Sequence, residues 1–253
     1  MERPIIIKLG GSLLSPYETA IKQVMSGALP FDFEYAKQLI SILAKTERQV
    51  VILVGGGFIN RWYLRNIKQV LGNIPDSTND LHTIGIASAV INASVFKILL
   101  QETLTDKGKV YPDVVKFGMY DDIAEIAHKF KESQFLIAAG WKPGHSHDLD
   151  AVKFAEIYGV NEFYSLKNID GVYTADPSKD PNAKRIAALS WDEYFDIIKA
   201  HTHEPGANFP VDPIAAEEAK EKGMACYVMS GKTFEEIERI LSGMMTTEAS
   251  RIG

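Results

Sequence analysis

A lysine and two glycines end an apolar run near the start of the chain, in the segment Lys8-Leu9-Gly10-Gly11-Ser12. Residues 5–9 have the unbroken apolar pattern of a strand that is covered on both faces. Glycines at the carboxyl end of such a strand let backbone N–H groups converge on an anion, and Lys8 would add a mobile positive charge. A tight turn with a surface lysine would use the same residues, so both interpretations stay open.

Three consecutive glycines, Gly55-Gly56-Gly57, follow the next predicted strand and precede a helix that holds Arg61. Such a run is costly in chain entropy, so a turn alone is a poor reason for it. Before a helix N-terminus the run makes a cradle for phosphate, and Arg61 lies one turn into that helix. The spacing is neither Gly-x-Gly-x-x-Gly nor the P-loop, which disfavours a dinucleotide fold and a Walker nucleotidase.

A third glycine-bearing segment, residues 139–148, also follows a predicted strand and ends at Asp148. Asp148 has two interpretations: the N-cap of the helix that follows, or an acid that orients Lys8. His145 and His147 alternate beside it, but two loop histidines without a third ligand at suitable spacing are more typical of a solvated loop. No protein-bound metal is therefore predicted here.

The fourth segment, Asn168-Ile169-Asp170-Gly171-Val172-Tyr173-Thr174-Ala175-Asp176-Pro177, contains an Asp-Gly turn signal and an Asp-Pro stop. A hairpin or structural loop explains these pieces singly. Tyr173 and Asp176 would alternatively flank a base and a ribose. Composition does not decide between the two.

The elements that must position these segments are short buried strands and amphipathic helices. The predicted strands are residues 5–9, 50–54, 135–138, 162–166 and 225–229. The predicted helices are residues 32–46, 59–71, 85–102, 150–158, 190–200, 214–222 and 233–242. Asp32 is a predicted N-cap, and Ser190-Trp191-Asp192-Glu193 is a predicted capping box. The alternation predicts an α/β fold with a largely parallel sheet and helices on both sides.

The composition is that of a globular protein. The 253 residues include 27 basic and 33 acidic ones, and the net charge of −6 gives no electrostatic footprint for nucleic acid or an anionic membrane. The single cysteine, Cys226, excludes an intramolecular disulfide and a multi-thiolate metal site. The start lacks the features of a signal peptide, and no apolar stretch is judged to approach the roughly 18 residues that span a bilayer. We therefore expect a soluble, cytoplasmic protein.

Taken in order, these motifs resemble the amino acid kinase family, and within it the uridylate (UMP) kinases, over nearly the whole chain. The first three segments match the opening lysine–glycine loop, the glycine triplet with its arginine, and a Pro-Gly-x-Ser-Thr-Asp loop. The fourth, continued through Ala183, is close to the nucleotide-loop signature and is the most specific match. Two further matches are the helix from Gly85 to Asn92-Ala93 and the segment 211–216.

The resemblance implies a three-layer α/β/α sandwich with a central, mainly parallel sheet, in which residues 1–160 bind the acceptor and residues 161–253 bind ATP. It implies a homo-oligomeric kinase that uses ATP and Mg²⁺ and acts on a small phosphorylated acceptor, most commonly UMP. Lys8 and Asp148 would be catalytic, because phosphoryl transfer requires charge neutralisation and positioning. The residues implied to contact ATP are Gly10, Gly11, Gly57, Arg61, Asn168, Asp170, Tyr173 and Asp176. Those implied at the acceptor are Gly55, Gly56, His82, Asn92, Gly140, Gly144, Ser146 and His147.

The chain departs from the uridylate kinase pattern at several positions, among them residues 88–91, which lack the Thr/Ser-Arg pair of many archaeal-type members. His82 stands where these kinases commonly carry an aspartate that binds ribose hydroxyls, and His147 and Lys167 each stand in place of a threonine. A kinase of the same fold that phosphorylates a carboxylate or another acceptor is therefore an alternative. A carboxylate kinase would need a second active-site lysine, a role that Lys167 fills only if the geometry allows it.

A third hypothesis is a non-catalytic nucleotide-binding protein that stores an oxyanion such as molybdate or tungstate. The observation behind it is a local enrichment in histidine, at His145, His147, His201 and His203. The second pair has the simpler interpretation of a solvated loop.

Overall fold

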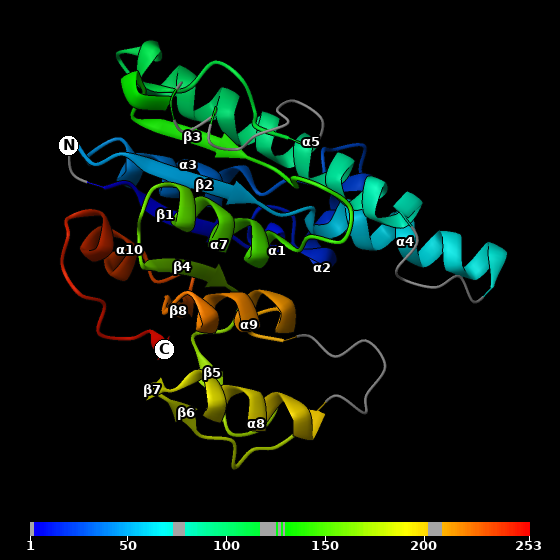
Figure 1. Ribbon diagram of the computed structural model, residues 1–253. Helices are drawn as coiled ribbons and strands as arrows, with labels where there is room; N and C mark the ends of the chain where they lie inside the picture. Colours follow the sequence, from blue (N-terminus) through cyan, green and yellow to red (C-terminus); the bar gives the residue numbers. More distant parts are fainter. Residues whose placement is uncertain (1–2, 73–78, 117–124, 126–127, 129, 202–208) are drawn as a thin grey trace.

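The computed structural model describes residues 3–72, 79–116, 125, 128, 130–201 and 209–253 (Figure 1). Its centre is a seven-stranded sheet in the order β3-β2-β1-β4-β8-β9-β7. The strands are β1 (Ile5–Leu9), β2 (Val50–Val54), β3 (Phe135–Ala138), β4 (Glu162–Lys167), β7 (Ala188–Leu189), β8 (Ala225–Ser230) and β9 (Ser250–Ile252). All neighbours are parallel except β8 and β9, which are antiparallel.

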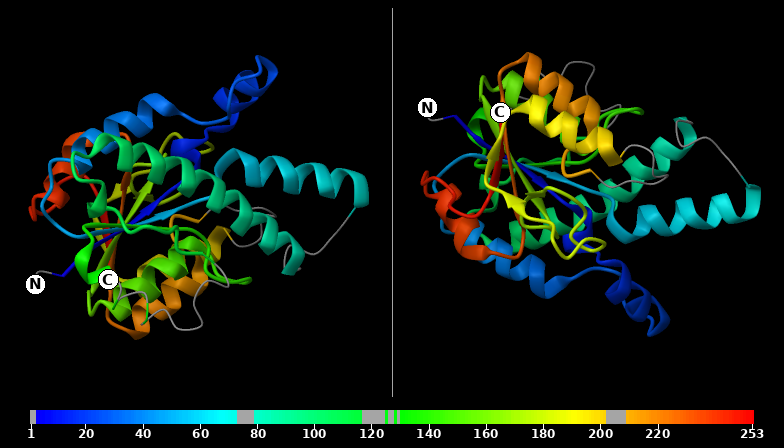
Figure 2. Two further views of the ribbon diagram at one scale, coloured as in Figure 1. Left: turned by 90° about the horizontal axis from the view of Figure 1, so that it is seen from above. Right: turned by 90° about the horizontal axis from the view of Figure 1, so that it is seen from below.

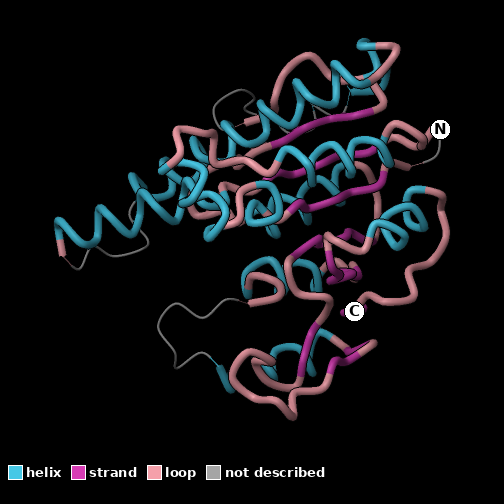
Figure 3. The backbone as a smooth tube through the Cα atoms, turned by 180° about the vertical axis from the view of Figure 1, so that it is seen from behind, coloured by secondary structure: helices cyan, strands magenta, loops and turns pink. Residues whose placement is uncertain are grey.

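Helices cover both faces of this sheet, as Figures 2 and 3 show. One face packs against α1 (Gly11–Leu14), α3 (Phe33–Leu43), α5 (Asn79–Thr103) and α10 (Phe234–Leu241). The other packs against α7 (His147–Ile157), α8 (Trp191–His201) and α9 (Pro213–Glu221). The molecule is therefore a three-layer α/β/α sandwich, and the sequence prediction of fold class is confirmed.

The remaining elements lie outside these layers. Helices α2 (Tyr17–Met25) and α4 (Gly57–Leu71) extend beyond the sheet, and α4 runs beside the first half of α5 (Figure 2). Strands β5 (Val172–Tyr173) and β6 (Arg185–Ile186) form an antiparallel hairpin. Two short 3-10 helices are η1 (Lys107–Lys109) and η2 (Phe130–Glu132).

Strand residues alternate between two cores, one on each face of the sheet. Ile7 belongs to the core under α3 and α5, whereas Ile6 and Phe163 belong to the core under α7 and α9. Because side chains alternate with a period of two, Lys8 continues the α7 side of β1 toward the carboxyl edge. β1 thus ends with its lysine on the same face as the N-terminus of α7.

All five predicted strands are present, and β4 and β8 each extend one residue further than predicted. The predicted helices are present too, but α4, α5 and α7 begin two to six residues earlier than expected. Two capping predictions are confirmed: the Asp32 carboxylate accepts from the Tyr35 N–H at 3.0 Å, and the Glu193 carboxylate accepts from the Ser190 N–H at 2.7 Å. Helices α1 and α2 and strands β5, β6, β7 and β9 were not predicted.

The expectation that no apolar stretch is long enough to span a bilayer is wrong for α5. Residues Asp80–Thr103 have the length and the mean hydropathy of such a span. Their apolar character is interrupted by Ser88, Asn92 and Lys97, so a search for an unbroken run misses it. The inner face of α5 buries Ala89, Phe96 and other side chains against the sheet, which makes it a core helix of a soluble sandwich.

Candidate active site

A cleft of about 1320 Å³ opens at the carboxyl edge of the sheet, where β1, β2 and β4 end. Thirteen of the residues singled out from the sequence line it: Lys8, Gly10, Gly11, Gly55, Gly57, Arg61, Ser146, His147, Asp148, Asn168, Asp170, Tyr173 and Asp176. Parallel strands bring their carboxyl ends to one edge, and this is why segments far apart in the chain meet here. The shared cleft expected from the motifs is present.

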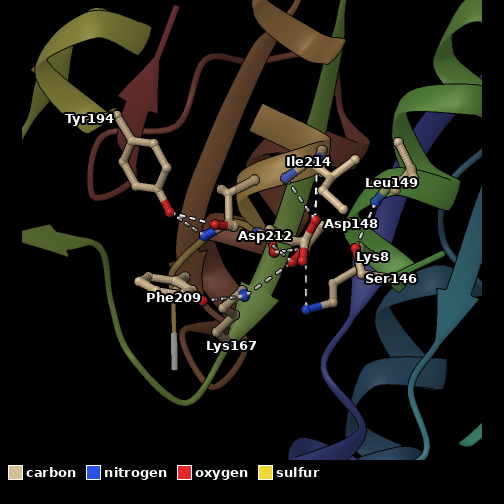
Figure 4. A network of polar contacts seen from close by, with 12 residues as sticks. Lys8, Ser146, Asp148, Leu149, Lys167, Tyr194, Phe209, Asp212 and Ile214 are labelled. Carbon is tan, nitrogen blue, oxygen red and sulfur yellow. Dashed lines mark hydrogen bonds and ion pairs between the residues drawn. The ribbon is translucent and has the colours of Figure 1, made fainter. Parts of the chain in front are cut away.

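Two lysines flank one aspartate at the floor of this cleft (Figure 4). The Lys8 Nζ lies 3.3 Å from Asp148 Oδ1, and the Lys167 Nζ lies 3.6 Å from Asp148 Oδ2. The three side chains are nearly buried, with exposed fractions of 12%, 16% and 8% for Lys8, Lys167 and Asp148. The predicted pairing of Lys8 with Asp148 is therefore confirmed, and Lys167 joins it.

Further donors hold the Asp148 carboxylate in place. The Ser165 hydroxyl donates to Oδ1 at 3.3 Å, and the Asp212 N–H donates to Oδ2 at 3.3 Å. The interpretation of Asp148 as an N-cap is wrong, because Ser146 caps α7 by accepting from the Leu149 N–H at 3.1 Å. Asp148 lies in the first turn instead, where the helix dipole favours a negative charge and its side chain is free to face β1 and β4.

The charges of this cluster influence one another strongly. Burial by itself would raise the pKa of Asp148, but the ammonium groups of Lys167 and Lys8 hold that pKa well below its usual value. The pKa of Lys167 is lowered from 10.5 to about 8: burial is the largest cause, Asp148 opposes the shift, and the neighbouring Lys8 charge contributes to it. Asp148 therefore stays ionised, and the floor of the cleft carries one net positive charge while both lysines are protonated.

The two glycine turns touch each other beside this cluster. A Cβ on Gly11 would lie 2.3 Å from the Gly57 nitrogen and 2.4 Å from the Gly55 carbonyl oxygen, and Gly57 has φ +57°. Glycine is needed at these positions because the two backbones pack directly together. Gly11 and Gly57 are also the first residues of α1 and α4, so their N–H groups have no acceptor within the helix and suit an anion.

Asn92 and Gly56 lie behind the glycine turn rather than on the cleft wall. The Asn92 side chain is buried on α5 and donates to the Gly55 carbonyl oxygen at 2.9 Å. A Cβ on Gly56 would lie 3.2 Å from the Ser88 Cβ of the same helix. Both residues position the turn in this structure, and the acceptor contact that the resemblance implies for them stays a prediction.

The loop before α7 forms one side of the cleft through Ser146 and His147 only. The fully buried Asp150 lies against this loop: its Oδ2 accepts from the Trp141 N–H at 3.3 Å, and its Oδ1 lies 3.3 Å from His145 Nδ1 without forming a hydrogen bond to it. Burial lowers the pKa of His147, which keeps its imidazole neutral near pH 7.

Three residues implied at the acceptor are not on the wall of this cleft. A Cβ on Gly140 would lie 2.8 Å from a carbon of Ile86, so this glycine lets the loop pack against α5. Gly144 has φ +85° and open space around it. His82 lies half-buried in the first turns of α5.

The nucleotide-loop signature forms the β5–β6 hairpin at the outer side of the cleft. The Tyr173 hydroxyl donates to the Asp170 carboxylate at 2.9 Å, and this hydrogen bond raises the Tyr173 pKa. The Asp176 carboxylate accepts from the Ser178 N–H at 2.9 Å and orders the turn that follows. The hairpin interpretation is confirmed, and Tyr173 and Asp176 line the cleft; their contact with a base and a ribose stays a prediction.

Several residues that line the cleft were not predicted as site residues from the sequence. These are Ser12, Asn60, Lys167, Ile169, Val172, Ala175, Pro177, Ser178, Lys179, Asp180, Ile197, Ile198, Phe209 and Pro210. For Lys167 a signal existed: it lies at the carboxyl end of β4, two residues beyond Ser165, which pairs in register with Lys8. Side chains two apart in a strand share a face, so Lys167 must lie on the face of Lys8. His203 and the side chain of His201 lie outside the described residues.

A family model described as the amino acid kinase family matches residues 3–230 of this chain. The uridylate kinase of Pyrococcus abyssi is 28% identical over 241 residues, which cover 94% of this chain and 95% of that protein. The uridylate kinase of Thermococcus sibiricus is 30% identical over 213 residues, 84% of each chain.

Solved structures resemble the chain over its full length. The crystal structure of uridylate kinase from Archaeoglobus fulgidus matches with a TM-score of 0.70 and 26% identity, over 99% of this chain and 100% of that one. The structure of UMP kinase from Ureaplasma parvum matches with a TM-score of 0.73 over 100% of both chains. At 19% sequence identity, this match shows a similar fold and nothing more.

Proposed function

Because the chain belongs to the amino acid kinase family, and is a phosphotransferase of that family, we propose that it transfers the γ-phosphoryl group of ATP to UMP. The family implies the use of ATP. Support for UMP comes from relatives named uridylate kinase that match nearly the whole chain. The single observation that carries the proposal is the ion pair of Lys8 and Asp148 at the floor of a cleft that the two glycine turns also line.

Phosphoryl transfer between two anions depends on neutralising charge and aligning the reactants, more than on covalent chemistry. The Lys8 ammonium would stabilise the charge on the transferred group, and Asp148 would fix its position. Backbone N–H groups at Gly11 and Gly57 would bind phosphate oxygens from the two turns. Removing the phosphates from bulk water in a cleft strengthens each of these interactions.

We propose that ATP lies against the β5–β6 hairpin and residues 161–253, and that the acceptor lies against residues 1–160. Tyr173 and Asp176 line the first region, whereas Ser146 and His147 line the second. The division is not one of separate sheets, because β4 of the second half pairs directly with β1 of the first.

Mg²⁺ fits this donor set as an ion that arrives on the nucleotide phosphates. Among the described residues, no group of three His, Cys, Asp or Glu side chains is placed to bind a metal, and Asp148 is already paired with two lysines. Mg²⁺ is commonly held by substrate phosphates together with one or two carboxylates, of which Asp170 and Asp176 line the cleft. When bound, the ion would neutralise charge on the β- and γ-phosphates.

We further propose a cytoplasmic homo-oligomer. ATP is available in the cytoplasm, and the outer face of α5 exposes the apolar side chains of Ile91 and Ile98. Light scattering coupled to gel filtration tests the assembly. A monomer at micromolar concentration would contradict this part of the proposal.

A coupled assay of ADP release tests the acceptor, with UMP, CMP, AMP and GMP offered separately at saturating ATP and Mg²⁺. We expect turnover with UMP to exceed turnover with the other monophosphates by at least about tenfold, a difference of roughly 1.4 kcal/mol in transition-state binding. Absence of turnover with every monophosphate would contradict the nucleotide acceptor.

One observation favours a second candidate, a carboxylate acceptor. That chemistry calls for a second lysine at the site, and the Lys167 Nζ lies 3.6 Å from Asp148. The same assay with aspartate, glutamate and acetylglutamate as acceptors distinguishes the two candidates. Retention of molybdenum or tungsten by the purified protein, without turnover on any acceptor, would instead support the storage hypothesis.

A further inference from the structure

The β5–β6 hairpin is too short to be stable by itself. It has only two pairs of residues in register, Val172 with Ile186 and Tyr173 with Arg185. An isolated two-stranded hairpin is marginally stable at best in water, so contacts with the rest of the molecule must hold this one. Figure 1 shows it beside α8, at the end of the molecule farthest from β3. The position of Tyr173 on the cleft therefore depends on what attaches the hairpin to the sheet.

One attachment is a serine of the C-terminal strand. Ser250, the first residue of β9, is fully buried and pairs in register with Val228 of β8. Its hydroxyl accepts from the Val172 N–H at 2.8 Å and donates to the Ile186 carbonyl oxygen. Because Val172 and Ile186 are register partners, this one hydroxyl joins both strands of the hairpin to the sheet.

Gly171 leaves the space that this hydroxyl occupies. A Cβ on Gly171 would lie 2.4 Å from the Ser250 Oγ and 3.0 Å from the Arg185 Cδ. Any larger residue at position 171 would therefore displace the hydroxyl. The glycine of the Asp-Gly turn signal thus also admits the contact with β9.

Loss of the hydroxyl would remove a partner from two backbone groups of the hairpin. Val172 is fully buried and Ile186 is half-buried, so water does not readily replace that partner. We expect β5 and β6 to shift until these groups are paired again. Tyr173 follows Val172 directly and would move with it, and so would the loop that carries Asp176.

The hairpin and the lysine–aspartate cluster have separate supports. Asp148 accepts hydrogen bonds from the Ser165 hydroxyl on β4 and from the Asp212 N–H. The hydroxyl of Ser250 bonds instead to β5 and β6. A change at position 250 should therefore affect the hairpin side of the cleft and leave the cluster in place.

We propose that Ser250 is a positioning residue for ATP: its hydroxyl fixes the β5–β6 hairpin against β9 and thereby places Tyr173 and Asp176 where the nucleotide binds. This inference rests on the proposed binding of ATP against the hairpin, but not on the identity of the acceptor. Strand β9, whose described residues 250–252 do not line the cleft, thus acts in substrate binding through the hairpin.

Calorimetric titration with the β,γ-imido analogue of ATP, in a buffer with Mg²⁺, provides the first test. We expect Ser250→Ala to raise the Kd of the analogue by about tenfold, the size of effect that loss of one hydrogen bond has. Ser250→Thr keeps a hydroxyl and should bind the analogue more tightly than Ser250→Ala does.

Thr46→Val is the matched control. The Thr46 hydroxyl is also buried, accepts from the Arg48 N–H at 3.1 Å and donates to the Leu241 carbonyl oxygen at 3.0 Å. Thr46 precedes β2, at the edge of the sheet away from the cleft. Thr46→Val should lower Tm about as much as Ser250→Ala does, while its Kd for the analogue stays within about twofold of wild type.

Steady-state kinetics separate positioning from general destabilisation. Ser250→Ala should raise the KM for ATP by about tenfold, while kcat and the KM for the acceptor change by less than about threefold. A KM for ATP equal to that of wild type, or an equal rise in the KM values for ATP and for the acceptor, would overturn the proposal.

Gly171→Ala tests the same contact from the hairpin, and it serves alone should Ser250→Ala not fold. The added Cβ must displace the Ser250 hydroxyl, so we expect the Kd of the analogue to rise by about tenfold here too. In the double variant the two effects should not add, because each removes the same contact. A wild-type Kd in Gly171→Ala, or an additive rise of about 100-fold in the double variant, would overturn the role of Ser250.

The wild-type protein distinguishes failure of this proposal from failure of the kinase function. If wild type does not bind the analogue, the proposed use of ATP is contradicted, and the role of Ser250 with it. If wild type binds the analogue and Ser250→Ala binds it equally well, only the role of Ser250 is contradicted.

Discussion

The lysine–aspartate cluster of Lys8, Asp148 and Lys167 and the loop before α7 lie at the same edge of the sheet, but different contacts position them. Lys8, Ser165 and Lys167 are fixed by strand register, since β1 and β4 pair directly and their side chains alternate between faces. The loop before α7 is positioned by side-chain contacts. Asp150 lies beside His145 and accepts a hydrogen bond from the Trp141 N–H, and Gly140 packs against Ile86. The positions of the lysines therefore follow from strand pairing, whereas the conformation of the loop depends on contacts between particular side chains.

This difference has a consequence for function. A site built on paired strands keeps its geometry when the surrounding loops change, whereas the loops set which acceptor is bound. The charge cluster is therefore suited to phosphoryl transfer in general, whereas His82 and His147 lie on helices α5 and α7, outside the paired strands. Substitutions in each region should therefore have different effects on kcat, KM and stability.

Asp148→Asn removes the charge that holds both lysines. We expect kcat to fall by about 1000-fold, because each ammonium loses its counter-charge and its fixed position at the reacting group. Asp192→Asn, which changes an exposed acid of α8, is the control. Steady-state kinetics together with a circular dichroism melt show the result, and a kcat of Asp148→Asn near that of wild type would mean that the cluster does not serve catalysis.

Gly11→Ala tests the contact between the two glycine turns. The added Cβ would lie 2.3 Å from the Gly57 nitrogen, so the turns must separate, and we expect a loss of about 3 kcal/mol or more in unfolding free energy. Gly85→Ala is matched to it, because a Cβ on that helical glycine meets only ordinary contacts at 3.6 Å. Chemical denaturation of both variants gives the comparison, and equal stability would show that the turns are not in close contact.

Titration of Lys167 should affect stability and activity in opposite directions. Its pKa is about 8 in the folded protein and 10.5 as the ordinary value, so between these the unfolded chain binds more protons and stability rises with pH. The groups facing it are Lys8 on β1, Asp148 on α7 and Cys226 on β8, and burial keeps the Cys226 thiol neutral by raising its pKa.

Between pH 8 and about 9.5, we expect the unfolding free energy of wild type to rise by roughly 2 kcal/mol more than that of Lys167→Met. Over the same range the kcat of wild type should fall. Denaturation and kinetics at matched pH provide the measurement. A difference between the two proteins that does not change with pH would show that Lys167 keeps its proton throughout.

Asn92→Ala tests whether α5 supports the glycine turn or binds the acceptor. Loss of the buried hydrogen bond to the Gly55 carbonyl oxygen should lower the unfolding free energy by about 1–3 kcal/mol, with little change in KM for the acceptor. Urea denaturation and steady-state kinetics measure the two quantities. A large rise in acceptor KM at unchanged stability would place Asn92 in the binding site after all.

Asp150→Asn is expected to have a smaller effect that is confined to the loop. His145 and the Trp141 N–H lose their charged partner, so the acceptor KM should rise by about tenfold while kcat changes little. Kinetics with the preferred acceptor check this result. If kcat of Asp150→Asn falls as much as that of Asp148→Asn, the loop and the lysine–aspartate cluster do not act as separate regions.

Strand pattern and glycine placement were sufficient to predict the core of this fold. The five main strands and the meeting of Lys8, Gly55 and Asp148 follow from apolar runs and from the shared edge of parallel strands. The sequence analysis names Lys167 only as a candidate second lysine, although its spacing from Ser165 would also have set its face of the sheet. The predicted strand stopped one residue short of it.

Other features could not be predicted because they depend on tertiary contacts. Strands β7 and β9 have two and three residues, too few for a pattern of their own, and they form by pairing with each other and with β8. The N-cap of α7 was one of two interpretations of Asp148, because a serine or an aspartate fits a cap locally; the structure has Ser146 as the cap and Asp148 paired with the two lysines.

Transfer of labelled phosphate measures the role of Lys8 most directly. Wild type and Lys8→Met are each mixed with γ-labelled ATP and UMP at saturation, and the label is followed into UDP and into inorganic phosphate. We expect wild type to place the label on UDP, and Lys8→Met to do so at least about 100-fold more slowly while still binding ATP. Equal rates in the two proteins, or label that appears only in inorganic phosphate, would contradict a cleft in which buried lysine charge drives phosphoryl transfer to the acceptor.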